Sequence, residues 1–369
     1  MYLYARRGAA MRIFPQKKGD KNMQKILTAM SGGVDSAIAC LLLRQQGYTV
    51  GGATMLLRSG GEGEAQDARR SALQLGLPFH LFSFQEEFDR NVIRPFAQSY
   101  RRGETPNPCI FCNKTMKFGL FLQQALALGY DGIATGHYAR VRLDRGSGRY
   151  LLLTAADAAK DQTYMLSVLT QQQLAHTVLP LGAYTKQQVR ELAAQAGLSI
   201  AQKHDSQDIC FVPDGDYMAY LRSRGFVPQP GHFRGTDGAD YGPHEGMEAY
   251  TFGQRRGLGL AFGSRMYVVG KQGADVVLGT SEQLYTDTVF VWDMNWIPFA
   301  RLTAPLRAQA KLRYTTRTAP CTVTPVQDGC LLRFDQPQRA PTPGQTAVLY
   351  DGEVVLGGGT ICQNSMETP

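Results

Sequence analysis

The stretch Ile26–Ser36, ILTAMSGGVDS, decides how the chain begins to fold. An apolar run leads into a turn of one serine and two glycines, and residues 37–43, AIACLLL, follow with a helical pattern. A strand, a glycine loop and a helix in this order place backbone N–H groups and a helix N-terminus against phosphate. We therefore predict a phosphate-binding loop at Ser31–Ser36, the alternative being a glycine-rich turn that binds nothing.

Two common nucleotide-binding loops are excluded by the same residues. No lysine stands where the pattern G-x-x-x-x-G-K-[ST] requires one, and the third glycine of the dinucleotide fingerprint is absent. The loop therefore binds phosphate, if at all, through its glycines, its serine hydroxyls and the helix N-terminus.

Length and composition set the broad class. The 369 residues are enough for two or three domains, and 43% hydrophobic residues is ordinary for a globular protein. No stretch is long and apolar enough to cross a bilayer, so no membrane partner is expected. The net charge of +8 favours a polyanionic partner, nucleic acid first, with a merely solvated basic surface as the alternative.

The cysteines indicate a reducing compartment. There are seven, most of them single and in apolar surroundings, and no signal peptide precedes them. We expect a cytoplasmic protein in which clustered cysteines serve metal binding, catalysis or sulfur chemistry. Residues 1–22 are basic, without an apolar period, and are expected to be a disordered extension or sequence upstream of a natural start at Met23.

Strand and helix patterns alternate through the first part of the chain, and predict an α/β domain over 23–213 with a doubly wound parallel sheet. In such sheets ligands bind beyond the carboxyl ends of the strands. Ser31, Met55 and Gly136 all fall at predicted strand ends, so they are expected to converge on one nucleotide. The predicted elements are strands at 25–29, 49–57, 79–84, 132–135 and 150–154, and helices at 36–46, 64–75, 115–128, 161–169 and 185–196. Thr185 is the predicted N-cap of the last helix.

The pattern changes near Pro213. Residues 214–280 are rich in Gly, Pro and Tyr and predict a small, mostly β central domain. Residues 281–369 contain evenly spaced short strands between turns, which is typical of a closed β-barrel. The predicted barrel strands are 286–292, 306–313, 319–326, 330–334, 345–350 and 353–361.

A pair of cysteines follows a proline-rich turn in TPNPCIFCNK, residues 105–114. Two prolines around Asn107 disfavour a regular helix, so we expect Cys109 and Cys112 on a loop. Their C-x-x-C spacing allows both thiols to reach one metal or each other, and Lys114 is expected to lower a thiol pKa. A third cysteine, Cys210, follows a polar stretch, and a buried structural thiol is the alternative for it.

Taken together, the chain resembles the bacterial tRNA-specific 2-thiouridylases, members of the PP-loop ATP pyrophosphatases, from Met23 to about Gly359. Several spaced motifs in the same order carry the resemblance. They are AMSGGVDS at Ala29–Ser36, TPNP…CN at Thr105–Asn113, ATGHYAR at Ala134–Arg140, KDQTYML at Lys160–Leu166, SQDICF at Ser206–Phe211, FGQRRGLG at Phe252–Gly259 and KLRY at Lys311–Tyr314.

The resemblance implies a reaction and a set of roles. ATP would adenylate the C2 oxygen of the wobble uridine, and sulfur would then displace AMP, with pyrophosphate as the other product. Cys210 would carry the sulfur as a persulfide and Cys112 would be its partner thiol, with a disulfide between them during the cycle. The other implied roles are ATP binding by Ala29, Met30, Ser31, Gly32, Gly33, Val34, Asp35, Ser36, Met55 and Gly136, target-base contact by Asn107, Pro108 and Cys109, and tRNA binding by Lys160, Asp161, Gln162, Arg313 and Tyr314.

The resemblance also implies partners. These are Mg²⁺ with the ATP, a cysteine desulfurase or sulfur-relay protein as donor, and tRNA of the glutamate, glutamine or lysine type, bound in part by the barrel. A monomer is expected.

One departure from the family pattern opens a second route. The family often has Asp where this chain has Cys109. Three thiols, Cys109, Cys112 and Cys210, could then hold an iron–sulfur cluster with one open iron for hydrosulfide. The persulfide route is preferred. Two further alternatives are an ATP pyrophosphatase that acts on a small molecule and an RNA-binding protein with a vestigial nucleotide fold.

Overall fold

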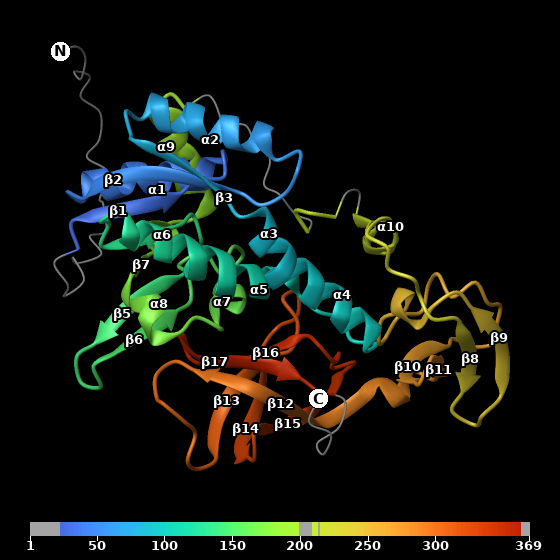
Figure 1. The fold of residues 1–369 in the computed structure, drawn as a ribbon. Coiled ribbons are helices and arrows are strands. Elements are labelled where there is room, and N and C mark those ends of the chain that lie inside the picture. The colour runs from blue at the N-terminus through green and yellow to red at the C-terminus, as the bar shows by residue number, and fades with distance from the viewer. Residues whose placement is uncertain (1–22, 199–208, 213–214, 363–369) are drawn as a thin grey trace.

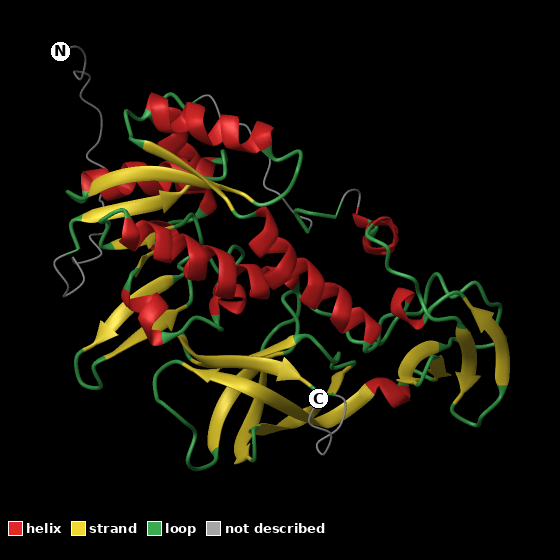
Figure 2. Ribbon diagram, viewed as in Figure 1, coloured by secondary structure: helices red, strands yellow, loops and turns green. Residues whose placement is uncertain are grey.

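The computed structural model describes residues 23–198, 209–212 and 215–362 (Figure 1). The expected extension at 1–22 and the first three residues of the motif at 206–211 lie outside these ranges. A parallel sheet with its helices forms one end of the molecule, and a small mixed sheet and an antiparallel barrel follow in the chain (Figure 2). None of the described helices combines the length and apolar character needed to cross a bilayer.

Five parallel strands form the first sheet. They are β1 (Lys25–Ala29), β2 (Thr49–Leu56), β3 (Phe79–Ser83), β4 (Gly132–Ala134) and β7 (Thr177–Val178). Their order is β3-β2-β1-β4-β7, so the chain moves outward from β1 to β3 and then crosses to the other side of β1. This reversal between β1 and β4 is the switch point at which such sheets bind ligands.

Helices cover both faces of this sheet, which confirms the doubly wound arrangement. Ile26 faces α1 (Val34–Gln45) and α2 (Glu62–Gln74), whereas its neighbour Leu27 faces α6 (Phe121–Ala127). Both side chains are fully buried, and burying each contributes about 1.5–3 kcal/mol. A further helix, α9 (Lys186–Gln195), packs beside α1, and the side chain of Thr185 caps its N-terminus as predicted.

The helix expected at 115–128 begins earlier, at Pro108, and its hydrogen-bond pattern changes along its length. It begins as α5 (Pro108–Phe111), continues as the π-helix η2 (Cys112–Leu120) and ends as α6. The prediction of a loop at Cys109 and Cys112 is therefore wrong. Asn107 and Pro108 occupy the N-cap and first-turn positions, where proline is favourable because its missing N–H has no helical partner.

The remaining helices are short. The helix expected at 161–169 is a single turn, α7 (Thr163–Leu166). The others are α3 (Gln85–Phe88), η1 (Asp89–Ile93), α4 (Arg94–Arg101), α8 (Gln171–Ala175), η3 (Pro180–Ala183), α10 (Tyr217–Ser223), η5 (Met247–Ala249) and η6 (Glu282–Leu284).

The central part is a four-stranded sheet of order β10-β11-β8-β9. Its strands are β8 (Gly231–Gly235), β9 (Asp240–His244), β10 (Tyr267–Gln272) and β11 (Asp275–Gly279). Their buried faces meet in a small apolar core around Phe233.

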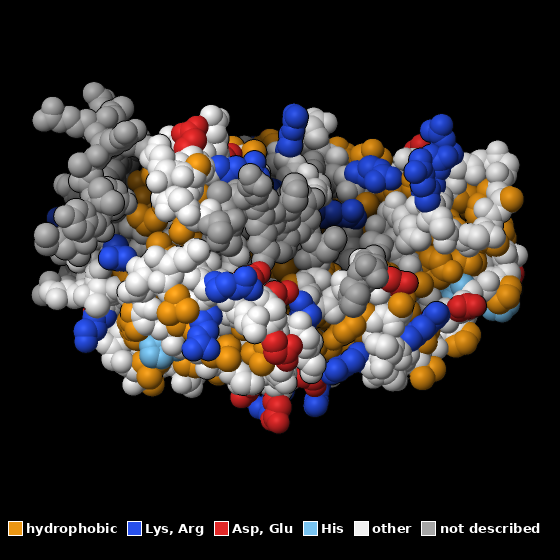
Figure 3. Space-filling view, turned by 90° about the horizontal axis from the view of Figure 1, so that it is seen from above, with side chains coloured by type: hydrophobic (Ala, Val, Ile, Leu, Met, Phe, Trp, Pro, Cys, Tyr) orange, Lys and Arg blue, Asp and Glu red, His pale blue; other side chains and the backbone are white. Residues whose placement is uncertain are grey.

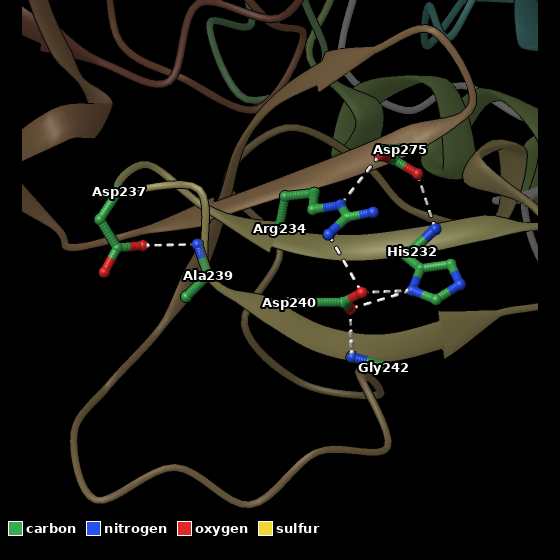
Figure 4. Close-up of polar contacts among 7 residues, drawn as sticks. All are labelled: His232, Arg234, Asp237, Ala239, Asp240, Gly242 and Asp275. Carbon is green, nitrogen blue, oxygen red and sulfur yellow. Dashed lines mark hydrogen bonds and ion pairs between the residues drawn. The ribbon is translucent and has the colours of Figure 1, made fainter.

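A polar network ties three of these strands together on their outer side (Figure 4). Asp275 accepts the His232 N–H at 2.7 Å and pairs with the Arg234 Nε at 3.2 Å. Asp240 pairs with Arg234 Nη1 at 3.0 Å and with the His232 Nδ1 at 2.8 Å. The backbone and side-chain donors around them hold the pKa of Asp240 and Asp275 below the usual range.

Six antiparallel strands form the closed barrel at the end of the chain, which the pairing of the first with the last completes. They are β12 (Tyr285–Trp296), β13 (Leu306–Lys311), β14 (Ala319–Val326), β15 (Gly329–Arg339), β16 (Thr346–Asp351) and β17 (Val354–Ile361).

A hairpin from the first part of the chain extends the barrel sheet. It consists of β5 (Arg140–Asp144) and β6 (Arg149–Leu153), and Leu153 pairs with Val354 of β17. Arg140 pairs with Glu353 at 2.7 Å. A strand was predicted at 150–154, but its pairing with the barrel strand β17 was not. This pairing ties the first and last parts of the chain together.

Candidate active site

The loop after β1 has the geometry of an anion site. Helix α1 begins at Val34, and no side chain caps its N-terminus, so its first N–H groups have no side-chain partner. Ser36 Oγ donates to the Gly33 carbonyl at 3.0 Å and accepts the Ser31 N–H at 3.3 Å, which shapes the turn from within. Gly32 has φ +71°, and a Cβ there would lie 2.7 Å from the Asp67 Cβ, so only glycine fits.

The acidic residue of the loop is held by two side chains from distant elements. Lys186 Nζ lies 2.8 Å from both carboxylate oxygens of Asp35. The Tyr138 hydroxyl donates to Asp35 Oδ1 at 3.0 Å. Lys186 is buried, with 7% of its surface exposed, so its charge is directed to this carboxylate.

Of the other two predicted nucleotide positions, Gly136 lies against this loop and Met55 lies in the apolar cores near it in the sheet. A Cβ on Gly136 would meet the Asp35 Cβ and the Ser36 nitrogen at 3.0 Å, which shows how closely the backbone after β4 approaches the first turn of α1. Met55, near the end of β2, packs against both the core beneath the sheet and the core that contains Cys112.

The first two thiols stand on one helix. Asn107 Oδ1 accepts the Cys109 N–H at 3.1 Å and so caps α5. Cys109 is exposed, whereas Cys112 at the start of η2 is buried. Because residues three apart share a helix face, both thiols are presented on one side.

The third thiol reaches the same region from 98 positions further along the chain. Cys210 is exposed, and its neighbour Phe211 packs edge-on against Phe88 and Phe96, with ring centroids 5.6 and 5.4 Å apart. Phe211 and Cys112 belong to one core cluster. The charges of Cys109 and Cys210 would each raise the pKa of Cys112, so the three thiols lie within electrostatic reach of one another.

Protein atoms around these thiols favour their neutral form. Although Cys109 and Cys210 keep exposed surface, the surrounding protein removes water from their other sides. This desolvation raises the pKa of all three thiols, that of Cys112 to about 11. The nearby cation that opposes this effect on all three pKa values is Lys117. The expectation for Lys114 is wrong, because its ammonium is directed to Asp293 of the barrel, 3.9 Å away.

His137 connects the thiol region to the phosphate loop. Its Nδ1 lies 2.7 Å from the Thr135 hydroxyl and its ring centroid 5.8 Å from that of Phe118. Burial, and then the charge of Lys117, lower its pKa well below the usual value, so the imidazole is neutral at pH 7. Gly136, whose backbone approaches the first turn of α1, directly precedes His137 in the chain. His137 therefore lies between the phosphate loop and the helix that carries Cys109 and Cys112.

The two predicted tRNA segments lie together. Burial and the charge of Asp161 raise the pKa of Tyr314, while Lys160 lowers it, which places all three side chains close to each other. Asp161 and Gln162 also have internal roles. Asp161 Oδ2 accepts the Ala155 N–H at 2.7 Å, and Gln162 Oε1 accepts the Tyr138 N–H at 2.9 Å.

Arg313 is anchored, whereas Tyr314 is open. The Arg313 guanidinium donates to the Ala340 carbonyl at 2.8 Å and to the Phe252 carbonyl at 3.3 Å, so it joins the barrel to the central part. The Tyr314 ring is exposed, with Lys311 Nζ 5.3 Å from its centroid. A cleft of about 200 Å³ lies beside them, lined by Thr105, Thr251, Arg313, Tyr314, Thr315, Thr342 and Gln345.

The sequence did not lead us to predict a role for three lysines near these sites: Lys117, Lys186 and Lys311. Lys311 stands in the quoted KLRY motif, so a signal for it was present. Lys186 follows a helix cap and Lys117 lies inside a helix, where a lysine is ordinarily a solvated surface residue.

Within the described ranges, no three His, Cys, Asp or Glu side chains are gathered as ligands for a metal ion. In this conformation the three thiols are therefore neighbours rather than an assembled ligand set.

Family comparisons cover nearly the whole chain. Residues 24–214 match the family described as tRNA methyl transferase HUP domain, residues 221–278 its PRC-barrel domain, and residues 286–361 the aminomethyltransferase beta-barrel domain. The three-part α/β, central β and barrel architecture agrees with this division.

Among curated proteins, the chain is 45% identical to the tRNA-specific 2-thiouridylase MnmA of Desulfitobacterium hafniense, over 92% of this chain and 98% of that protein. It is 47% identical to the protein of the same name from Moorella thermoacetica, over 91% and 98%. Among solved structures, a 4-thiouridine synthetase in complex with RNA and ATP is 16% identical and aligns over 55% of this chain and 50% of that chain, with a TM-score of 0.36.

Proposed function

The chain belongs to the tRNA-specific 2-thiouridylase family, and from that premise we propose that it replaces the C2 oxygen of a wobble uridine with sulfur, at the expense of ATP. The observation that carries this proposal is the meeting of two halves of a site. A phosphate loop on one side connects through Gly136 and His137 to three thiols on the other.

The first step is activation of the carbonyl. The uncapped N-terminus of α1 and the Ser31–Gly33 turn bind the phosphates of ATP, and the uridine O2 attacks the α-phosphorus. The C2–O–P bond forms as pyrophosphate leaves. The triphosphate would carry Mg²⁺, which would offset part of its charge.

The second step is sulfur transfer. The terminal sulfur of a Cys210 persulfide attacks C2, and the C2–O bond breaks with AMP as the leaving group. The Cys112 thiolate then attacks the Cys210 sulfur, which releases 2-thiouridine and leaves a Cys112–Cys210 disulfide. A two-electron thiol reductant restores both thiols, and a cysteine desulfurase or sulfur-relay protein reloads Cys210.

The geometry supports these roles for the two cysteines. Cys210 is exposed and can receive sulfur from another protein, whereas Cys112 is buried, which protects it from solution thiols. The high pKa of Cys112 keeps it protonated at rest, so it becomes nucleophilic only when a base or a change of environment removes its proton.

The tRNA would lie across the face that carries Lys160, Lys311 and Tyr314. An exposed aromatic ring beside a lysine offers a stacking surface and a phosphate contact in one place. Figure 3 shows several Lys and Arg side chains toward the end of the molecule formed by the central sheet, where they could follow an RNA backbone. Asn107–Cys109 would contact the target base, which must leave its stack to be reached.

The iron–sulfur route remains the second candidate because Cys109 adds a third thiol to the pair. Protein purified without oxygen and found free of iron, yet active, supports the persulfide route. If the wild type contains iron, and Cys109→Ser loses both the iron and the activity, the result supports the cluster.

The test is direct. Unmodified tRNA with a wobble uridine is incubated with ATP, a sulfur source and the wild-type protein, and its nucleosides are analysed by mass spectrometry. We expect 2-thiouridine with wild type and none with Cys112→Ser or Cys210→Ser. AMP formed without RNA would favour an enzyme of small molecules, and RNA binding without AMP formation would indicate a non-enzymatic protein.

A further inference from the structure

Lys117 occupies an unusual place on the thiol helix. It stands five positions after Cys112, and in an α-helix that spacing places two side chains about 140° apart. The segment Cys112–Leu120 is instead a π-helix, in which hydrogen bonds join residues five apart, as from the Phe121 N–H to the Met116 carbonyl. Residues five apart then lie on nearly the same face, so the π-helix brings Lys117 round to the side of Cys112.

The pKa shifts of the surrounding groups agree with this orientation of the Lys117 side chain. The charge of Lys117 lowers the pKa of all three thiols and of the His137 ring. Lys114, three residues earlier on the same helix, is directed away to Asp293.

The charge around Lys117 is unbalanced. In the described part of the chain, no carboxylate forms an ion pair with it, and its neighbours are neutral thiols and a neutral imidazole. Arg58 and Glu64, which also act on Cys210, pair with each other at 2.7 Å. A half-buried cation without a paired anion favours an anionic ligand.

We propose that Lys117 is the positioning residue of the sulfur-transfer step, and that its ammonium holds the anionic sulfur in the space between the three thiols. This inference rests on the proposed function, and it names the residue that directs hydrosulfide or the terminal persulfide sulfur toward the activated base. In the transfer itself, the C–S bond forms, the C–O bond to AMP breaks, and the electron pair leaves with AMP.

The experiment separates the sulfur step from the earlier ones. Sodium sulfide serves as the sulfur source with ATP and a tRNA transcript, so no donor protein is needed. The attacking HS⁻ loses its remaining proton to solvent, and no disulfide forms. Three quantities are measured: the KM for sulfide in 2-thiouridine formation, the tRNA-dependent exchange of labelled pyrophosphate into ATP, and the Kd for tRNA.

For Lys117→Met, we expect the KM for sulfide to rise by about tenfold or more. Pyrophosphate exchange and tRNA affinity should remain within about twofold of wild type, since adenylation precedes sulfur entry. Lys117→Arg should recover most of the loss because it keeps the charge, and Lys114→Met, the matched control on the same helix, should behave as wild type.

Three outcomes would overturn this inference. They are an unchanged KM for sulfide, a loss of tRNA affinity that accounts for the whole effect, and an equal loss in Lys114→Met. If Lys117→Met does not fold, Lys117→Gln decides by the same criteria. A wild-type protein that forms no 2-thiouridine would instead overturn the proposed function.

Discussion

Lys186 Nζ lies 2.8 Å from both carboxylate oxygens of Asp35, although 151 positions separate the two residues. The contact joins the start of α9 to the first turn of α1, directly behind the phosphate loop. Together with the Tyr138 hydroxyl, it uses both oxygens of a carboxylate that would otherwise stand beside the incoming triphosphate. The pair therefore shapes the loop and also reduces its negative charge.

Lys186→Met should lower both stability and nucleotide affinity. The substitution leaves the Asp35 carboxylate without its charged donor, which costs about 1–3 kcal/mol in the free energy of unfolding. The KM for ATP should rise because an uncompensated carboxylate repels phosphate. Urea denaturation and pyrophosphate exchange measure the two effects. As control, Arg307→Met removes the exposed pair with Asp335 and should cost much less, because solvent screens the attraction between exposed charges.

Gly136→Ala should weaken ATP binding through the backbone. The new Cβ would lie 3.0 Å from atoms of Asp35 and Ser36, so the first turn of α1 must shift. We expect the KM for ATP to rise, with tRNA affinity little changed. Gly63→Ala is the matched control, since a Cβ at Gly63 in α2 meets nothing within 4 Å. Equal kinetics for the two variants would contradict the close approach.

Asn107→Ala should disturb the thiol helix at its start. Asn107 Oδ1 accepts the Cys109 N–H, and loss of such a cap costs about 1 kcal/mol. The rate of 2-thiouridine formation should fall by more than the small loss of stability explains, because Cys109 and Cys112 are displaced. Asn107→Asp keeps the acceptor and should retain the stability. The idea fails if Asn107→Ala unfolds at the urea concentration of the wild type.

Acid should open the central sheet through Asp275. Its bonds from His232 and Arg234 hold its pKa below 3.8, the usual value for this carboxyl. Their contribution to stability is therefore complete above pH 3.8 and is lost as the pH falls toward the lowered pKa, because the unfolded chain binds the proton first. Hydrogen exchange of the β8 and β11 amides should show this loss (Figure 4).

Asp275→Asn tests that assignment, since it keeps the acceptor for the His232 N–H but cannot ionise. The variant should be less stable at neutral pH and should show a smaller loss in acid. Asp328→Asn, in the turn between β14 and β15, is the control with unchanged acid behaviour. A wild-type acid response in Asp275→Asn would assign the effect to another carboxyl.

Tyr314→Ala should weaken tRNA binding. The ring is 38% exposed, with Lys311 5.3 Å away, and base stacking on such a ring contributes about 1–3 kcal/mol. Tyr314→Phe should retain most of the affinity. Tyr285→Ala removes a ring that is 49% exposed at the start of β12, and serves as the control. Equal Kd values for Tyr314→Ala and Tyr285→Ala would place the RNA elsewhere.

Local patterns were sufficient for much of this fold. The strand at Lys25–Ala29 and the Thr185 cap of α9 were both predicted, because side-chain periodicity and capping depend on neighbours within one or two turns. The helix start at Pro108 was missed, although proline at a first-turn position is itself a local signal.

The sequence by itself determined the parallel sheet, the phosphate loop and the cysteine motifs, since each is written in consecutive residues. Only the tertiary structure brought Cys210 within electrostatic reach of Cys112, moved the β5–β6 hairpin into the barrel sheet and set Lys186 against Asp35. The π-helix, which turns Lys117 toward the thiols, also belongs to this second group. The reason is that these contacts depend on packing between segments far apart in the chain, and no local periodicity records which distant side chain fills a given space.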